Sequence, residues 1–129
     1  MTSLSAAAGL SRIGQIAVNV RDLDRAVAFY RDTLGLPFLF AIPNAAFFEC
    51  GGLRLMLAIA EAPEFDHAAS IIYYLVDDIQ AAGTALAAAG VKIESEPRLI
   101  ARMPDHELWM CFFRDSEENM VAVMSEVRE

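Results

Sequence analysis

Two stretches of the chain share one pattern of apolar and polar positions. The first alternates apolar and polar residues from Ile16 to Val20, reaches Asp22, and then spaces apolar residues as in a helix until Gly35. The same order returns over residues 72–90. A period of two is typical of a half-buried strand, a period near 3.6 of an amphipathic helix, and an aspartate between them of a helix cap. Repetition at a fixed offset indicates a duplicated strand and helix.

Three further strands are predicted after each helix, which gives the order βαβββ twice. Turn signals at Pro43-Asn44 and Gly51-Gly52 separate them in the first copy. The predicted strands span 37–41, 45–50 and 53–58 in the first copy, and 91–95 (with an extension toward Arg102 as an alternative), 108–113 and 120–124 in the second. Each helix has one apolar stripe to bury, so it should cover one sheet face and leave the other free. The predicted fold class is α+β, with two βαβββ modules forming a curved, cup-shaped mixed sheet and helices on its outer face.

The domain organisation follows from the same pattern. A single domain over residues 1–129 is expected, with module one at about 13–59 and module two at about 70–126. The polar, aperiodic segment 60–69 between them is interpreted as a solvated linker that contains His67, and residues 1–11 as a loose arm.

Charge and composition exclude several classes of partner. Ten basic side chains against eighteen acidic ones give a net charge of −8, which repels phosphate backbones and anionic membrane surfaces, so neither nucleic acid nor membrane is an expected partner. No apolar run approaches the roughly 20 residues needed to cross a bilayer, and no signal sequence precedes the first strand, so a cytoplasmic protein is expected. Cys50 and Cys111 lie in apolar runs without Cys-x-x-Cys spacing and are expected to be reduced.

Several motifs in this order resemble one family. They are Ile16-x-Val18-x-Val20-x-Asp22-Leu23, Ala28-Phe29-Tyr30, Leu34-Gly35-Leu36, Val76-Asp77-Asp78-Ile79 and Phe112-Phe113-Arg114-Asp115. Together they resemble the vicinal oxygen chelate superfamily, the group of glyoxalases, bleomycin-resistance proteins and extradiol dioxygenases. The resemblance covers roughly residues 13–125 and implies the paired-module fold and a homodimer, but it leaves open isomerases, transferases, oxygenases and metal-free binding proteins.

The resemblance also implies where a metal would sit. In metal-dependent members four inward side chains hold the ion, and the corresponding positions here are Gln15, Met56, Ile71 and Ala122. Only the glutamine offers an oxygen, whereas a divalent ion needs several oxygen, nitrogen or thiolate ligands. Neither a metal nor any other cofactor is therefore expected.

Few residues remain for chemistry. His106 is either a general acid or base at the rim of the cup or a solvated loop histidine beside acidic neighbours. Glu49 is the second candidate catalytic residue, and it faces either the cup or solvent at a sheet edge. Arg54 should share the Met56 face, where it either pairs with Glu49 or another acid or meets an anionic ligand.

The remaining candidates describe an organic-ligand site. Gln15 and Asn19 would orient the ligand, and aromatic residues are expected to line the cup with the four family positions. The candidate ligand-binding residues are Gln15, Asn19, Phe48, Arg54, Met56, Ile71, Tyr73, Trp109 and Ala122, with Phe47 as a further aromatic. The leading hypothesis is metal-free sequestration of a small, partly apolar molecule. The alternative is a lyase or isomerase of the glyoxalase type that uses His106, with any metal at Gln15, Glu49 and His106. A purely structural partner-binding module has no specific support.

Overall fold

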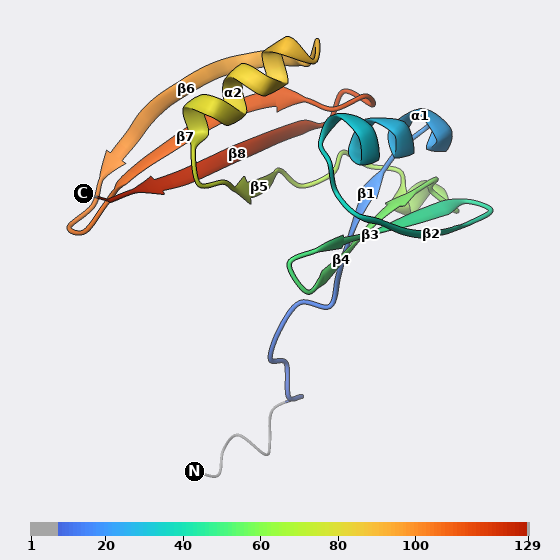
Figure 1. Ribbon diagram of the computed structural model, residues 1–129. Coiled ribbons are helices and arrows are strands. Elements are labelled where there is room, and N and C mark those ends of the chain that lie inside the picture. The colour runs from blue at the N-terminus through green and yellow to red at the C-terminus, as the bar shows by residue number, and fades with distance from the viewer. Residues whose placement is uncertain (1–7, 129) are drawn as a thin grey trace.

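Two four-stranded sheets with the same internal order form the framework of the protein (Figure 1). The computed structural model describes residues 8–128, so residues 1–7 of the expected arm lie outside the described residues. Sheet A has the order β1-β4-β3-β2 and sheet B the order β5-β8-β7-β6, with the first and last strands of each module parallel. The elements are β1 (Gln15–Asn19), α1 (Leu23–Ala28), η2 (Phe29–Thr33), β2 (Phe38–Ile42), β3 (Ala45–Cys50), β4 (Leu53–Ala58), η3 (Pro63–Phe65), β5 (Ile72–Leu75), α2 (Ile79–Ala88), β6 (Lys92–Arg102), β7 (Glu107–Arg114) and β8 (Met120–Val127). The predicted α+β class and the repeated βαβββ order are confirmed.

One face of sheet A is buried beneath α1, as the alternating pattern predicted. Val18 of β1 and Val20, which follows the strand, pack with Ala26 and Tyr30 of the helical segment and with Leu55 of β4 in one apolar cluster. Intervening side chains of β1 lie on the opposite face, which we call the open face of sheet A. The predicted register of β1 is therefore correct.

Both helices begin at the predicted aspartates. Asp22 accepts a hydrogen bond from the Arg25 backbone N–H at 3.0 Å, and Asp78 accepts one from Ala81 at the same distance. The first helix has an unpredicted feature, because α1 continues as the π-helical turn η2, in which the Leu34 N–H donates to the Phe29 carbonyl at 2.9 Å.

Sheet B is covered by α2 in the same way. Ile79 and Leu86 of the helix pack on Phe113, Val121 and Val123 of the sheet. Strand β6 runs for 11 residues and so realises the extension toward Arg102. The small side chains of α2 allow a close approach, because a Cβ atom on Gly83 would lie 2.8 Å from Pro97 Cγ of β6.

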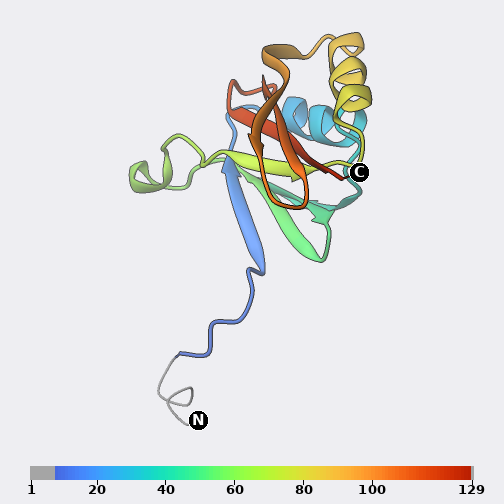
Figure 2. The same ribbon diagram turned by 90° about the vertical axis from the view of Figure 1, so that its left-hand side faces the viewer.

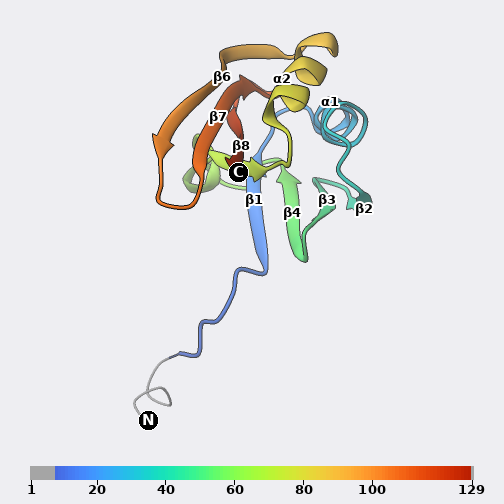
Figure 3. The ribbon, with the colours of Figure 1, turned by 60° about the vertical axis from the view of Figure 1, so that its left-hand side comes forward.

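The two modules meet through their helical sides. Helices α1 and α2 lie side by side in Figures 1 and 3, and Phe29 and Leu34 pack against the apolar clusters of both modules. The open faces of both sheets stay outside this shared core. No helix among residues 8–128 is long and apolar enough to cross a membrane.

Candidate functional site

The open face of sheet A carries a hollow of about 390 Å³. Its floor consists of side chains that project from three adjacent strands on the face away from α1. Floor residues are Ala17 of β1, Ala45 of β3, and Met56 and Ala58 of β4. Most of the lining is apolar, with polar groups at the rim from Asn19, Asn44 and Ser70. Such a hollow suits a small organic molecule.

The second wall of the hollow comes from residues 60–70, which we call the strap. Figure 2 shows the strap projecting from the end of β1 that is nearest sheet B. Phe65 and His67 of the strap line the hollow together with the floor residues. The interpretation of His67 as part of a solvated linker was therefore incomplete, since its side chain is exposed yet borders the hollow.

Asn19 holds the strap in place. Its Nδ2 donates to the backbone carbonyls of Phe65 and His67, both at 2.6 Å. A second link joins Arg21 and Asp66 at 3.7 Å, but these side chains are 82% and 48% exposed, so solvent screens their attraction. Asn19 lies at the site as predicted, although its N–H groups bind the strap.

The other end of the open face is polar. Gln15 approaches the Met56 sulfur at 3.7 Å, and the Arg54 guanidinium lies 5.7 Å from the centre of the Phe47 ring. Glu49 accepts a hydrogen bond from the Gly52 N–H in the β3–β4 turn. Arg54 shares the Met56 face as expected. Arg54 makes no ion pair with Glu49 or another acid within residues 8–128, because the Glu49 carboxylate binds the Gly52 N–H and the guanidinium lies by the Phe47 ring.

Two aromatic residues predicted to bind the ligand lie on the helix-covered faces of the sheets and not on the open faces. Phe48 is fully buried beneath α1, where its ring lies 6.2 Å from that of Tyr30. Trp109 packs on the apolar cluster beneath α2 and donates its indole N–H to Glu107. The position of a residue along a strand decides on which face of the sheet its side chain lies. Here both aromatic side chains lie on the face that the helices cover.

The candidates of module two are separate from the hollow. Ile71 precedes β5, and Tyr73 and Ala122 are paired neighbours in sheet B, where the Tyr73 ring lies 5.8 Å from Phe112. The hollow is lined by residues between Ala17 and Ser70. Within one chain, these side chains of module two therefore do not line the hollow on sheet A.

This separation bears on the metal positions that the resemblance implied. Gln15 and Met56 adjoin one another on sheet A, whereas Ile71 and Ala122 belong to the sheet B side. One amide oxygen and one thioether do not make a site for a divalent ion. Within residues 8–128 no group of three or more His, Cys, Asp or Glu side chains is placed to hold a metal. The residues present do not fit the family's metal.

His106 lies far along sheet B from the hollow. It follows the turn between β6 and β7 and contacts the Asp105 carboxylate at 2.8 Å, in a different hollow lined by Arg102 and Val127 among others. The His106 hydrogen bond lowers the pKa of Asp105 below its ordinary value. The alternative metal set of Gln15, Glu49 and His106 is not brought together.

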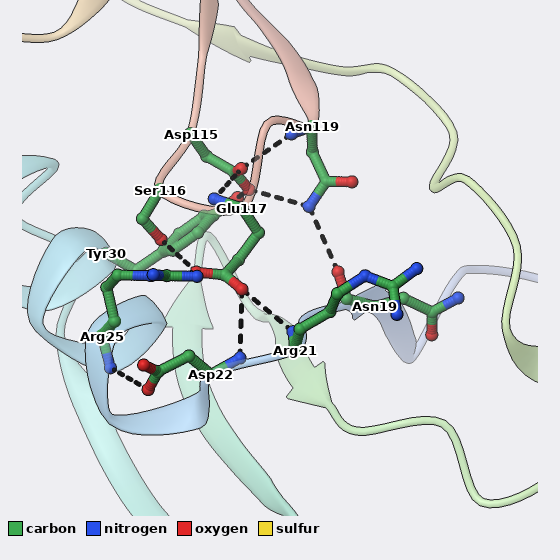
Figure 4. Close-up of polar contacts among 9 residues, drawn as sticks. All are labelled: Asn19, Arg21, Asp22, Arg25, Tyr30, Asp115, Ser116, Glu117 and Asn119. Atoms are coloured by element: carbon green, nitrogen blue, oxygen red, sulfur yellow. Dashed lines mark hydrogen bonds and ion pairs between the residues drawn. The ribbon is translucent and has the colours of Figure 1, made fainter.

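A polar cluster joins the two modules next to Asn19 (Figure 4). We call it the latch, and its centre is Asp115, which is 4% exposed at the start of the β7–β8 turn. Its carboxylate accepts from the Tyr30 hydroxyl at 2.7 Å, from the Glu117 N–H at 2.8 Å and from the Asn119 backbone N–H at 2.9 Å. The Asn119 side chain also donates to Asp115, and to the Asn19 carbonyl at 3.2 Å. The latch therefore fixes the strand end from which Asn19 holds the strap.

Glu117 supplies the charged part of the latch. Its side chain is 2% exposed and accepts from Arg25 Nε at 2.8 Å and from the backbone N–H groups of Arg21 and Asp22. Burial opposes its ionisation, but these hydrogen bonds prevail and lower the pKa of Glu117 to about 2. Arg25 of the first helical turn therefore belongs to the latch through its ion pair with Glu117.

Sequence reasoning missed three parts of this region: Phe65, His67 and the latch. The residues that meet in the latch are 85 to 100 positions apart in the chain. The one local signal is the Asp115-to-Asn119 turn, whose side chains fold back on their own backbone as turn-forming residues do.

Comparisons with known proteins find one family model and several solved structures that are similar to this chain. A family model described as Glyoxalase/Bleomycin resistance protein/Dioxygenase superfamily matches residues 12–123. Lactoylglutathione lyase from Agrobacterium tumefaciens is 27% identical with a TM-score of 0.70, and the match covers 90% of this chain and 94% of that one. A superfamily member from Sphaerobacter thermophilus is 20% identical with a TM-score of 0.75, covering 91% and 98% of the two chains. A virulence protein from Salmonella typhimurium is 18% identical with the same TM-score, covering 92% and 98%. No curated protein sequence matches the chain.

Proposed function

The chain belongs to the glyoxalase/bleomycin resistance protein/dioxygenase superfamily, and on that basis we propose that it binds a small, partly apolar organic molecule without a metal. The observation that carries this proposal is the hollow on the open face of sheet A, with its apolar floor and few polar rim groups. Its volume of about 390 Å³ lies within the range of pockets that enclose small organic ligands.

Sequestration accounts for the site better than catalysis does. A metal-dependent reaction needs a cluster of ligands, and Gln15 and Met56 are the family positions that lie at this face. An acid or base must reach the reacting atoms, and His106 borders a different hollow. The name of the Agrobacterium relative describes a lyase, so the enzymatic alternative is worth a direct assay.

Titration with Nile red, a planar apolar dye, tests the proposal. We expect saturable fluorescence enhancement with one dye per hollow. Met56→Lys should abolish it, because a charge then projects from the apolar floor. Thr84→Lys, an equally cationic change at an exposed position of α2, is the matched control and should bind as the unaltered protein does. Equal binding by both variants would contradict the proposal.

Two further measurements address the metal and the reaction. Elemental analysis of protein purified without chelator should show no near-stoichiometric zinc, nickel or manganese. Incubation with methylglyoxal and glutathione, with and without those ions, should yield no S-lactoylglutathione. Near-stoichiometric metal that is lost on Gln15→Ala, or product formation, would favour the enzymatic alternative.

We also propose that the protein is a homodimer in which a second copy covers the exposed strand β5. This strand forms an edge of sheet B, and it exposes Tyr73 by 44% and Leu75 by 68%. An edge strand with exposed apolar side chains favours association with another chain. The hollow takes its lining from module one and the strap, so a second copy could add a further wall.

Analytical ultracentrifugation tests this assembly at micromolar concentration. Leu75→Lys should raise the dimer dissociation constant by at least about tenfold, since it places a charge in the covered surface. Gln80→Lys adds the same charge on an exposed position of α2 and should leave the dimer intact. A monomer mass for the unaltered protein would overturn the proposal.

A further inference from the structure

We propose that the strap selects the ligand: a planar ring, neutral or cationic, lies between Phe65 and the apolar floor of the hollow, and Asn19 is the positioning residue that holds the strap beside it. This inference rests on the proposed function and specifies which chemical class the hollow takes. It assigns a role to Phe65, whose segment the sequence pattern placed in a solvated linker.

The shape of the hollow favours a flat ligand. Three of the four floor residues, Ala17, Ala45 and Ala58, project no further than a methyl group, and the fourth, Met56, adds a flexible, unbranched side chain that can lie flat beneath a ring. Phe65 forms part of the opposite wall and is 55% exposed, which leaves ring surface for a partner. Aromatic rings gain from stacking or edge contacts in addition to the apolar area that they bury.

The charges around the hollow favour a neutral or cationic ring. Among the lining residues within 8–128, Glu61 is acidic, and neither lysine nor arginine contributes to the lining. The chain as a whole carries a net charge of −8. Glu61 and the net negative charge would both repel an anionic ring, whereas they would attract a cationic one.

Asn19 determines where this wall stands. One NH₂ group supplies both hydrogen bonds that tie the strap carbonyls of Phe65 and His67 to β1. The surface pair of Arg21 and Asp66 adds little, because exposed pairs contribute about 0–1 kcal/mol. Asn19 is itself fixed through its carbonyl, which accepts from Asn119 in the latch. The position of Phe65 therefore depends mainly on one side-chain amide.

Asn19→Asp tests the positioning role, because it keeps the size of the side chain and replaces the two donated hydrogens with an acceptor. Amide hydrogen exchange of residues 62–68 should become faster, and the affinities for Nile red and for the planar cation proflavine should both fall by about tenfold or more. Asp66→Asn, which removes only the surface ion pair, is the control and should change each by less than about twofold. Thermal unfolding of both variants should stay close to that of the unaltered protein.

A pH profile separates positioning from general damage. Below about pH 4 the new carboxyl group of Asn19→Asp becomes protonated and donates one hydrogen bond, so protection of the strap should partly return. A merely destabilised variant would lose protection further as the pH falls. Unchanged strap exchange in Asn19→Asp would overturn the positioning role.

The planar class is tested on the strap itself, where substitution leaves the body of the protein intact. Phe65→Leu should weaken proflavine binding by about tenfold, while Phe65→Trp should retain it, since only the latter keeps an aromatic face. Equal affinities of these two variants, or tighter binding of an anionic planar dye than of proflavine, would overturn the proposed ligand class. If the unaltered protein binds no dye, the proposed function fails and the ligand class with it, whereas strap exchange still tests Asn19 separately.

Discussion

The two modules share one strand order but differ in the side chains at the centre of their open faces. In module one the central row pairs Ala17 of the first strand with Met56 of the last, and the alanine is exposed. In module two the same row pairs Tyr73 with Ala122, and the alanine is fully buried between Tyr73 and its neighbours. The small side chain of the row therefore lies on the first strand in module one and on the last strand in module two. A duplicated backbone thus provides two similar scaffolds, of which module one has the hollow that the strap covers.

The hairpin turns between the last two strands differ as well. Module one uses Gly51 and Gly52, both exposed with positive φ, and one Glu49 carboxylate caps the turn. Module two uses the turn from Asp115 to Asn119, which reaches across to module one as the latch. Module one therefore carries the hollow, and module two supplies the turn that joins the two modules. The predictions below test each half of this contrast.

The largest effect is expected at the centre of the latch. Asp115→Ala should lower the free energy of unfolding by about 3 kcal/mol, because it leaves the buried Tyr30 hydroxyl and two turn N–H groups without their acceptor. Glu49→Ala, at the corresponding turn of module one, should cost under about 1 kcal/mol. Urea denaturation measures both. Equal costs would remove the contrast between the two turns.

Glu117→Gln should have the next largest effect, about 2 kcal/mol at neutral pH, because it weakens charge-assisted hydrogen bonds. The folded state lowers the pKa of Glu117 from 4.5 to about 2. This stabilisation is therefore complete above about pH 4.5 and is lost as the pH falls through about 2. The difference between the two proteins in urea denaturation should shrink over that window. A constant difference would show that the carboxylate charge contributes nothing.

Ala17→Tyr gives module one the residue that module two has at the equivalent position. The phenol ring should fill the hollow and weaken Nile red binding by at least about tenfold, while the free energy of unfolding changes by less than about 0.5 kcal/mol at this exposed site. Fluorescence titration and urea denaturation measure the two effects. Retained binding would place the ligand elsewhere.

The smallest effect is expected at His106. His106→Ala should change dye affinity by less than about twofold, because the histidine borders a separate hollow beside Asp105. The same titration applies, with Ala17→Tyr as the positive control. A loss of affinity comparable to that of Ala17→Tyr would return His106 to the site, for instance through a second copy.

The sequence was sufficient to predict the fold because its signals are local. Period-two strands, the caps at Asp22 and Asp78 and the glycine stops each depend on residues a few positions apart. The face of β1 was predictable for the same reason, since alternation allows only two registers and one buries three apolar side chains.

The site was predictable only in part. Gln15, Asn19 and Met56 follow from the register of sheet A, and they lie at or beside the hollow. Phe48 and Trp109 were misassigned because an aromatic residue in a strand suits either face. The strap and the latch depend on contacts between residues more than 40 positions apart, such as Asn19 with Phe65 and Arg25 with Glu117. A periodic pattern has no means of specifying them.

The outer strands of the two sheets have opposite consequences for behaviour in concentrated solution. Strand β6 alternates exposed and half-buried residues, and five of its six exposed side chains are charged, which disfavours pairing of a second strand with the unpaired backbone groups of this edge. Strand β2 is an edge too, yet it exposes Phe38, Leu39, Phe40 and Ile42. A short, uncharged, apolar edge is the type of segment that seeds open-ended β-aggregation. We therefore expect β2 to be the edge from which aggregation begins at high protein concentration, and Leu39→Lys to reduce it.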